Sequence, residues 1–253
     1  IFLLSVSSLS ADAPLSWLSA KNKEIVNDKG QSITLRGVNL GSWFVEELWM
    51  LPITQDPPKN SPYTIIQDHV SLWKTFEKRF GKEKMEQIKH HYRLCWIHDI
   101  DFANIKAAGF NTVRLPFLYD LQHETTGLFY WLDHAVELAK RHGLYIILDM
   151  HGVPGRQSNS MHTGEVDKGE FFSEQSHIDK TCAIWKEIAK HYKDCPQIAG
   201  YDLINEPMNA PGPKELFKMY DKIYKAVRSE DKRHLIFLED GYKGLSHIPH
   251  PKD

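Results

Sequence analysis

The sequence has few cysteines, no excess of charge of either sign and no long apolar run, and each lack excludes a class of protein. Its three cysteines, Cys95, Cys182 and Cys195, form no CxxC pair and no Cys/His spacing typical of zinc. We expect buried free thiols, with pairing of Cys182 and Cys195 as the alternative in an exported protein. The 31 basic and 33 acidic side chains leave a net charge of −2, so no basic surface for nucleic acid or an anionic membrane is expected. No stretch approaches the roughly 20 apolar residues of a membrane span.

No predicted strand is followed by a glycine-rich loop that could bind phosphate, which argues against a nucleotide-binding α/β protein. No metal and no organic cofactor is implied. The 253 residues, 42% hydrophobic and 25% charged, have the composition of one ordinary globular domain. A neutral ligand fits this charge balance best, and we expect the full-length protein to be a monomer.

The N-terminus is an apolar run followed by small residues and has no initiator methionine (Ile1-Phe-Leu-Leu-Ser-Val-Ser-Ser-Leu-Ser-Ala-Asp-Ala13). This pattern resembles the end of a secretory signal peptide. We therefore expect residues 1–13 to be the remnant of a signal, residues 14–253 to be the N-terminal part of a larger domain, and the protein to be secreted or periplasmic. The alternative is an ordinary frayed terminus.

Apolar strand patterns alternate with amphipathic helix patterns along the rest of the chain. The predicted core strands are 33–39, 111–116, 144–150, 198–204 and 234–239. The predicted helices are 71–80, 82–91, 99–108, 130–142, 176–193 and 214–230. Segment 24–26 is predicted to form a hairpin with the first strand around a turn at 28–30. Continuously apolar strands between helices indicate a parallel sheet buried on both faces.

Polar residues recur at the carboxyl ends of these strands. They are Asn39, Arg114, Asp149, His151, Asn205, Glu206, Glu239 and Asp240. Side chains gathered from several strand ends onto one rim are typical of a (β/α)8 TIM barrel. Only about five of the eight strands are present, so the sequence predicts an α/β fold that is an incomplete barrel.

The segment Tyr201-Asp-Leu-Ile-Asn-Glu-Pro207 places Glu206 at such a strand end. Cleavage of a glycosidic bond requires protonation of a poor leaving oxygen, and a carboxylic acid does this when its pKa is raised toward the working pH. Glu206 is a candidate for this general acid, and Asn205 for a hydrogen bond to a neighbouring sugar hydroxyl. The alternative is that Asn-Glu-Pro only ends a strand, with Glu206 in solvent.

Five motifs, in this order, resemble glycoside hydrolase family 5, the cellulase family of retaining barrel glycosidases. They are Leu35-Arg-Gly-Val-Asn-Leu-Gly-Ser-Trp-Phe44, Trp96-Ile-His-Asp-Ile-Asp-Phe102, Gly109-Phe-Asn-Thr-Val-Arg-Leu-Pro116, Leu148-Asp-Met-His-Gly-Val-Pro-Gly155 and Asn205-Glu-Pro207. The first and fourth are most similar to the exo-β-1,3-glucanase branch. The resemblance covers most of the chain and indicates an N-terminal fragment.

The resemblance implies roles for five residues. Glu206 would be the acid/base, and Asn205 would bind the 2-hydroxyl of the sugar under attack. Arg114 would keep the nucleophile ionised, while His151 and Glu47 would line the subsite of that sugar. An ion pair without catalytic role is the alternative for Arg114, and a capping role at the strand end is the alternative for His151. Weaker candidates are Trp43, Trp49 and the loop 156–162.

A retaining glycosidase also needs a second carboxylate about 5 Å from the acid/base. The family supplies it as a glutamate at the end of a seventh strand, which this chain lacks, and Glu239 and Asp240 are not expected to replace it. The resemblance therefore implies a retaining β-glycosidase that hydrolyses β-glucans as the full-length protein, and an inert fragment. The alternatives are an endo-β-1,4-glucanase or mannanase of the same family, and a non-catalytic degenerate barrel that binds carbohydrate or acts as a scaffold.

Overall fold

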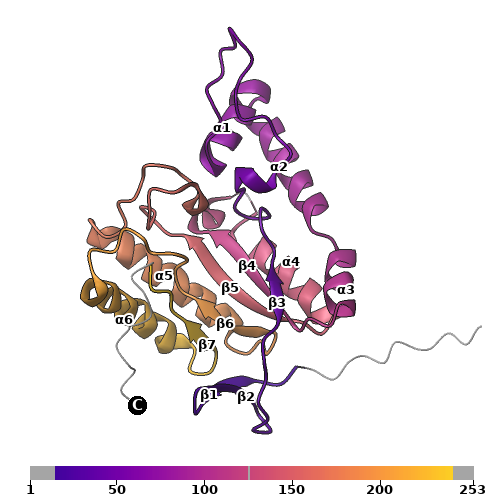
Figure 1. The fold of residues 1–253 in the computed structure, drawn as a ribbon, viewed down its shortest axis with the longest axis vertical. Coiled ribbons are helices and arrows are strands. Elements are labelled where there is room, and N and C mark those ends of the chain that lie inside the picture. Colours follow the sequence, from indigo (N-terminus) through magenta and orange to yellow (C-terminus); the bar gives the residue numbers. More distant parts are fainter. Residues whose placement is uncertain (1–14, 125, 242–253) are drawn as a thin grey trace, which may run out of the picture.

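A computed structural model describes residues 15–124 and 126–241, and its core is a five-stranded parallel sheet (Figure 1). The strands lie side by side in chain order: β3 (Gly37–Asn39), β4 (Thr112–Leu118), β5 (Tyr145–Gly152), β6 (Ile198–Asp202) and β7 (Leu235–Phe237). The predicted incomplete barrel is confirmed. The predicted signal remnant, residues 1–13, lies outside the described residues.

Four helices follow the strands and cover one face of the sheet. They are α3 (Asp99–Ala107), α4 (Leu128–Arg141), α5 (Gln175–Tyr192) and α6 (Pro213–Glu230). Pro213 occupies the first turn of α6, where its missing N–H is not needed by the helix. On the covered side of the sheet, Val113, Leu148 and Tyr201 have no exposed surface. Burial of these apolar side chains under the helices is the main stabilising contribution to the fold.

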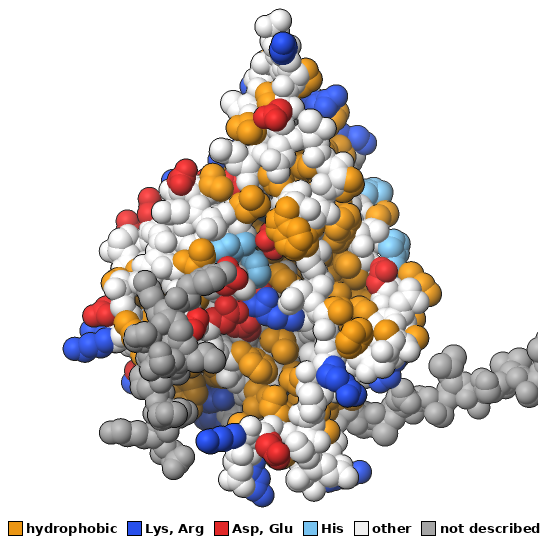
Figure 2. Space-filling view, in the orientation of Figure 1, with side chains coloured by type: hydrophobic (Ala, Val, Ile, Leu, Met, Phe, Trp, Pro, Cys, Tyr) orange, Lys and Arg blue, Asp and Glu red, His pale blue; other side chains and the backbone are white. Residues whose placement is uncertain are grey.

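The opposite face of the sheet carries the polar residues. Arg114 is paired in register with Ile147, and Asp149 with Asp202. Because side chains two residues apart on a strand share a face, these four lie on the same side. This inner face is open within the described residues, and Figure 2 shows hydrophobic side chains exposed beside a cluster of acidic and basic ones. Most side chains of β4, β5 and β6 are nevertheless buried on both faces, as predicted, whereas Arg114, Ile147 and all of β7 are partly exposed.

The long segment between β3 and α3, residues 40–98, forms a small unit of its own, which we call the excursion. It contains η1 (Leu48–Met50), α1 (His69–Phe80) and α2 (Lys82–Trp96). A reciprocal capping box between Asp68 and Ser71 starts α1. Two further 3-10 turns, η2 (Tyr119–His123) and η3 (Met161–Thr163), follow β4 and β5. The excursion contacts the segment after β5, since Val166 N donates to Asp68 Oδ2 at 2.8 Å.

The N-terminal hairpin differs from the predicted one. It pairs β1 (Leu18–Lys21) with β2 (Glu24–Asn27). The predicted pairing of segment 33–39 with β2 is limited to its start, where the Ile33 N–H donates to the Ile25 carbonyl at 2.8 Å beside a bridge between Val26 and Ser32. A tight turn at Asn22 and Lys23, both with positive φ, makes the closer strand the partner of β2. The first core strand is accordingly short.

All three cysteines are free thiols in the structure. Cys182 and Cys195 are partly buried against the core, whereas Cys95 is exposed on α2, so the expectation of burial is wrong for Cys95. Trp43 is fully buried, and its indole N–H donates to the carbonyl of Arg93 at 2.8 Å, which makes it a packing residue. Across residues 15–124 and 126–241, no helix combines the length and apolar character needed to cross a bilayer.

Candidate active site

The structure brings all five candidate residues into the lining of one cavity at the carboxyl edge of the sheet. The cavity has a volume of about 600 Å³. Arg114 reaches it from β4, His151 from β5, Asn205 and Glu206 from the segment after β6, and Glu47 from the loop after β3. Trp49, Met50 and His162 complete its mouth. A cavity of similar size, about 650 Å³, lies beside α2 and contains none of the candidates.

Arg114 is the centre of the hydrogen-bond network on the inner face. Its guanidinium contacts Asp202 Oδ2 through Nε at 2.9 Å and through Nη2 at 2.7 Å. Asp149 Oδ2 lies 3.0 Å from Nη1, and Glu239 Oε1 lies 2.9 Å from Nη2. Nη2 also donates to Asn205 Oδ1 at 3.0 Å. From β4, one cation therefore holds groups of β5, of β6 and of the two segments that follow β6 and β7.

The three carboxylates around Arg114 exceed its single positive charge. Burial, followed by repulsion from Asp149, raises the pKa of Asp202 to about 6 despite the guanidinium. Burial and repulsion from Asp202 raise the pKa of Glu239 to about 7. Burial lowers the pKa of Arg114, but Asp149 and Asp202 outweigh this effect and the pKa is raised. The inner face therefore retains protons on its carboxyl groups at mildly acidic pH.

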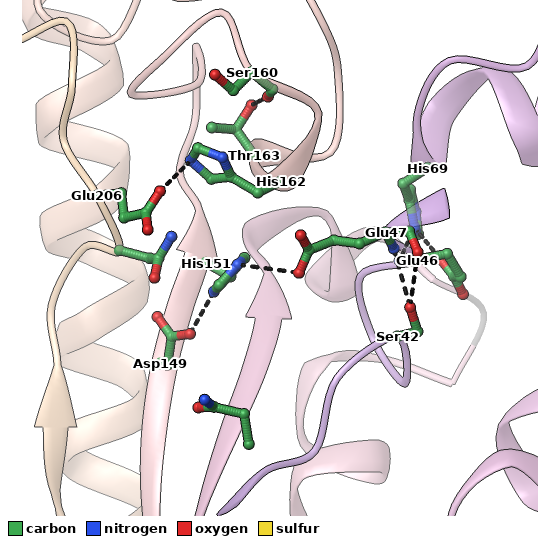
Figure 3. Close-up of polar contacts among 12 residues, drawn as sticks. Ser42, Glu46, Glu47, His69, Asp149, His151, Ser160, His162, Thr163 and Glu206 are labelled. Atoms are coloured by element: carbon green, nitrogen blue, oxygen red, sulfur yellow. Dashed lines mark hydrogen bonds and ion pairs between the residues drawn. The ribbon is translucent and has the colours of Figure 1, made fainter. Parts of the chain in front are cut away.

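His151 lies between two carboxylates (Figure 3). Its Nδ1 is 2.5 Å from Asp149 Oδ2, and its Nε2 is 3.7 Å from Glu47 Oε1. Burial and the positive charge of Arg114 lower the pKa of His151 to about 4, so the imidazole is neutral at neutral pH. Glu47 also accepts a hydrogen bond from the indole of Trp49 at 3.0 Å. The Glu47 carboxylate is thus held in position on the cavity wall.

Glu206 lies beyond the end of β6, which stops at Asp202 rather than at the predicted Asn-Glu pair. Its side chain is 36% exposed, and Oε2 is 3.7 Å from Nε2 of His162 (Figure 3). Its backbone has φ +40°, in the left-handed region, which costs a non-glycine residue roughly 1–2 kcal/mol. Such outliers cluster at functional sites. The N–H of Glu206 donates to Glu239 Oε2 at 2.7 Å.

Asn205 is oriented by its neighbours. Arg114 has only donors, so the atom of Asn205 that faces it is Oδ1, and the amide Nδ2 remains to donate elsewhere. The Asn205 carbonyl accepts from Nε2 of Gln157 at 2.7 Å, and the same nitrogen donates to the His151 carbonyl at 2.8 Å. The buried Gln157 thereby ties the loop after β5 to the segment after β6. A sugar hydroxyl in the cavity would meet an amide donor and a carboxyl group side by side.

Sequence reasoning missed three residues of this site. The motifs give no role to Glu239 at the rim, and they include His162 and Gln157 only as members of the weaker candidate loop 156–162. Strand-end position was the available signal for Glu239. Nothing in the local pattern marks Gln157, because its partners are backbone atoms. Within the part of the chain that the structure describes, no cluster of three or more His, Cys, Asp or Glu side chains is arranged to hold a metal ion.

Comparison with known sequences matches residues 81–248 to the family model of cellulase (glycosyl hydrolase family 5). The relatives include a β-xylosidase of Phanerodontia chrysosporium, 30% identical over 93% of this chain and 48% of its own length. Glucan 1,3-β-glucosidase 1 of Schizosaccharomyces pombe is 27% identical over 97% of this chain and 61% of its own length. The chain thus spans about half the length of such relatives.

Solved structures share the fold. A rutinosidase from Aspergillus niger superimposes with a TM-score of 0.66 at 16% identity, over 81% of this chain and 62% of that one. A β-glucanase from Saccharophagus degradans gives 0.56 at 19% identity, over 90% of this chain and 55% of that one. The family match extends over more than half of the sequence and includes the strands that carry Arg114 and His151 and the segment after β6 that carries Glu206. The chain therefore belongs to glycosyl hydrolase family 5.

Proposed function

We propose that the full-length protein is a retaining β-glycosidase that hydrolyses β-glucans, with Glu206 as its acid/base. The observation that carries the proposal is the shared cavity: Glu206, Asn205, His151 and Glu47 line it together, and Arg114 orients the amide of Asn205. A cavity lined by carboxyl, amide and imidazole groups with an exposed indole at its mouth suits a neutral, hydroxyl-rich ligand.

In the first step, the protonated Glu206 donates its proton to the glycosidic oxygen while the bond from that oxygen to the anomeric carbon breaks. A second carboxylate attacks the anomeric carbon and forms a glycosyl ester. Asn205 Nδ2 donates to the sugar hydroxyl beside the reacting carbon. In the second step, the ionised Glu206 takes a proton from water as the water oxygen displaces the ester carboxylate.

The described carboxyl groups of the inner face are poor candidates for the second carboxylate. Asp149 and Asp202 are held behind the cavity by Arg114, and Glu239 is bonded to the Glu206 N–H. We propose that the nucleophile is the glutamate that the family places at the end of a seventh strand, outside this chain. Residues 14–253 would then be the N-terminal part of the barrel domain, and the chain alone would be inactive.

For the substrate, we propose a β-1,3-glucan attacked from its end, because relatives named glucan 1,3-β-glucosidases match nearly the whole chain. Glu47 would bind hydroxyls of the sugar at the cleavage point. β-1,4-Glucans, mannans and xylosides are the competing substrates, and cleavage within the glucan chain (endo) is the competing mode. The products released from laminarin distinguish exo from endo cleavage, since exo cleavage releases only glucose at early times.

We also propose that the protein is exported and that residues 1–13 are removed. The apolar N-terminal run supports this proposal. Sequencing the N-terminus of the secreted protein tests it, and a mature protein that retains residues 1–13 would contradict it.

The decisive experiment compares the full-length protein with its Glu206→Gln variant on laminarin and an aryl β-glucoside. Loss of the acid/base should lower turnover of laminarin by about 100-fold or more. Glu137→Gln, an exposed change on α4, is the matched control and should retain full activity. The 253-residue chain alone should show no turnover. Glu206-dependent hydrolysis by that chain would show that the nucleophile lies within it.

A non-catalytic carbohydrate-binding barrel is the second candidate, favoured by the lack of an evident second carboxylate among the described residues. It predicts that the full-length protein binds laminarin without cleaving it. Sequencing the gene beyond Asp253 also distinguishes the glycosidase from the non-catalytic barrel, because a further strand that ends in Gly-Glu would supply the nucleophile.

A further inference from the structure

Glu239 lies directly behind the candidate acid/base and outside the lining of the cavity. Its two carboxyl oxygens contact different groups. Oε1 accepts from Nη2 of Arg114 at 2.9 Å, and Oε2 accepts from the N–H of Glu206 at 2.7 Å. Glu239 therefore joins the arginine at the centre of the inner face to the backbone that carries Glu206.

That backbone needs support, because Glu206 has φ +40°. A peptide held in the left-handed region by a non-glycine residue relaxes unless its surroundings hold it in place. The bond from the Glu206 N–H to the Glu239 carboxyl group can do so, and it is charge-assisted when Glu239 is ionised. The following residue, Pro207, has no N–H to offer.

Glu239 is itself fixed. The hydroxyl of Tyr220, on α6, donates to the Glu239 carbonyl at 2.9 Å and accepts from the Glu239 N–H at 3.2 Å. The charged groups that influence Glu239 are Arg114 on β4 and Asp202 on β6, and the raised pKa of about 7 reflects burial followed by repulsion from Asp202. A chain of contacts thus runs from a buried helix residue to the backbone of Glu206.

We propose that Glu239 is a positioning residue, which aims the Glu206 carboxyl group at the leaving oxygen by holding its backbone N–H and by bonding Arg114 at the same time. This inference rests on the proposed role of Glu206. Arg114 and the Glu206 N–H both donate to the Glu239 carboxyl group, which also shares a hydrogen bond with the Asp202 side chain. A glutamine has a single acceptor oxygen and therefore cannot keep both of these donors. Its amide must turn its own N–H donors toward either Arg114 or the Glu206 N–H.

The test uses the full-length protein and two β-glucosides that differ only in leaving group. Methyl β-glucoside needs a proton from the acid, whereas 2,4-dinitrophenyl β-glucoside leaves without one. Glu239→Gln should lower kcat/KM for the methyl glucoside by about 10-fold or more and for the dinitrophenyl glucoside by less than about 3-fold. Its kcat for the dinitrophenyl glucoside should fall and recover in azide, because azide attacks the anomeric carbon without a base.

Tyr220→Phe should give the same selective defect in weaker form, since it frees the backbone of Glu239. Glu137→Gln on α4 should behave as wild type on both glucosides. An equal loss on both substrates in Glu239→Gln, or no loss on either, would overturn the positioning role. Failure of the proposed function looks different: the wild-type enzyme would then hydrolyse neither glucoside, and Glu206→Gln would change nothing.

Discussion

The carboxyl groups around Arg114 keep raised pKa values although the guanidinium lowers them. Arg114 is partly buried, and it contacts three carboxyl groups, those of Asp149, Asp202 and Glu239, with one positive charge. Burial, followed by repulsion between the carboxyl groups, raises the pKa values of Asp202 and Glu239 above those of the unfolded chain. The folded state therefore binds protons more tightly than the unfolded state, and the stability of the chain must depend on pH.

We predict that the 253-residue chain becomes less stable as the pH rises from about 4 to 7. The pKa of Glu239 rises from 4.5 to about 7 on folding, so its contribution is complete below its unfolded value and is lost as the pH passes through 7. The loss should be roughly 3 kcal/mol in the free energy of unfolding. Urea unfolding of dilute protein at several pH values measures it. Glu239→Gln should weaken the dependence of the free energy of unfolding on pH, whereas Glu137→Gln should leave it unchanged. The reverse pattern would contradict the assignment of this dependence to Glu239.

Among the larger elements, the strands place the site residues and the loops between them complete it. Strand order and register follow from the apolar patterns, which is why the sequence predicted that Arg114, His151 and Asn205 would meet at one rim. The loop after β5 is different. Its position depends on Gln157, whose side chain bonds the carbonyls of His151 and Asn205 and accepts from the N–H of Val153. Such side chain to backbone contacts leave no periodic signal in a sequence.

We predict that Gln157→Leu destabilises the protein although the volume hardly changes. Three buried backbone groups lose their partner, and each unsatisfied group costs about 1–3 kcal/mol, so the total should be roughly 3 kcal/mol or more. Chemical denaturation of the full-length protein measures the change. Gln87→Leu, at an exposed position of α2, is the matched control. Equal stability of the two variants would show that the hydrogen bonds of the Gln157 side chain to the backbone do not stabilise the protein.

For the chain as a whole, the open sheet dominates the physical behaviour. Within the described residues, β3 and β7 are each paired on one side, and the side chains of β7 are all partly exposed. The inner face adds exposed apolar surface to these two strand edges (Figure 2). Unpaired edges and apolar patches favour association with other chains.

We predict that the isolated 253-residue chain associates or aggregates. It should sediment as species larger than a monomer at micromolar concentration and bind a hydrophobic dye such as ANS. The full-length protein, with its sheet completed, should do neither. A monomer of the short chain that melts in one sharp, cooperative transition without binding dye would contradict this prediction.

The pattern of apolar strands and helices, with polar residues at strand ends, was enough to predict the fold class and the rim at which Arg114, His151, Asn205 and Glu206 meet, whereas Glu47 was identified only through the family resemblance. Periodicity is a local property of the chain, so the sequence shows it directly. The contacts of Glu239, His162 and Gln157 with the site depend on distances between segments remote in sequence. Only packing of the whole chain fixes such distances, because each results from all the neighbouring elements at once.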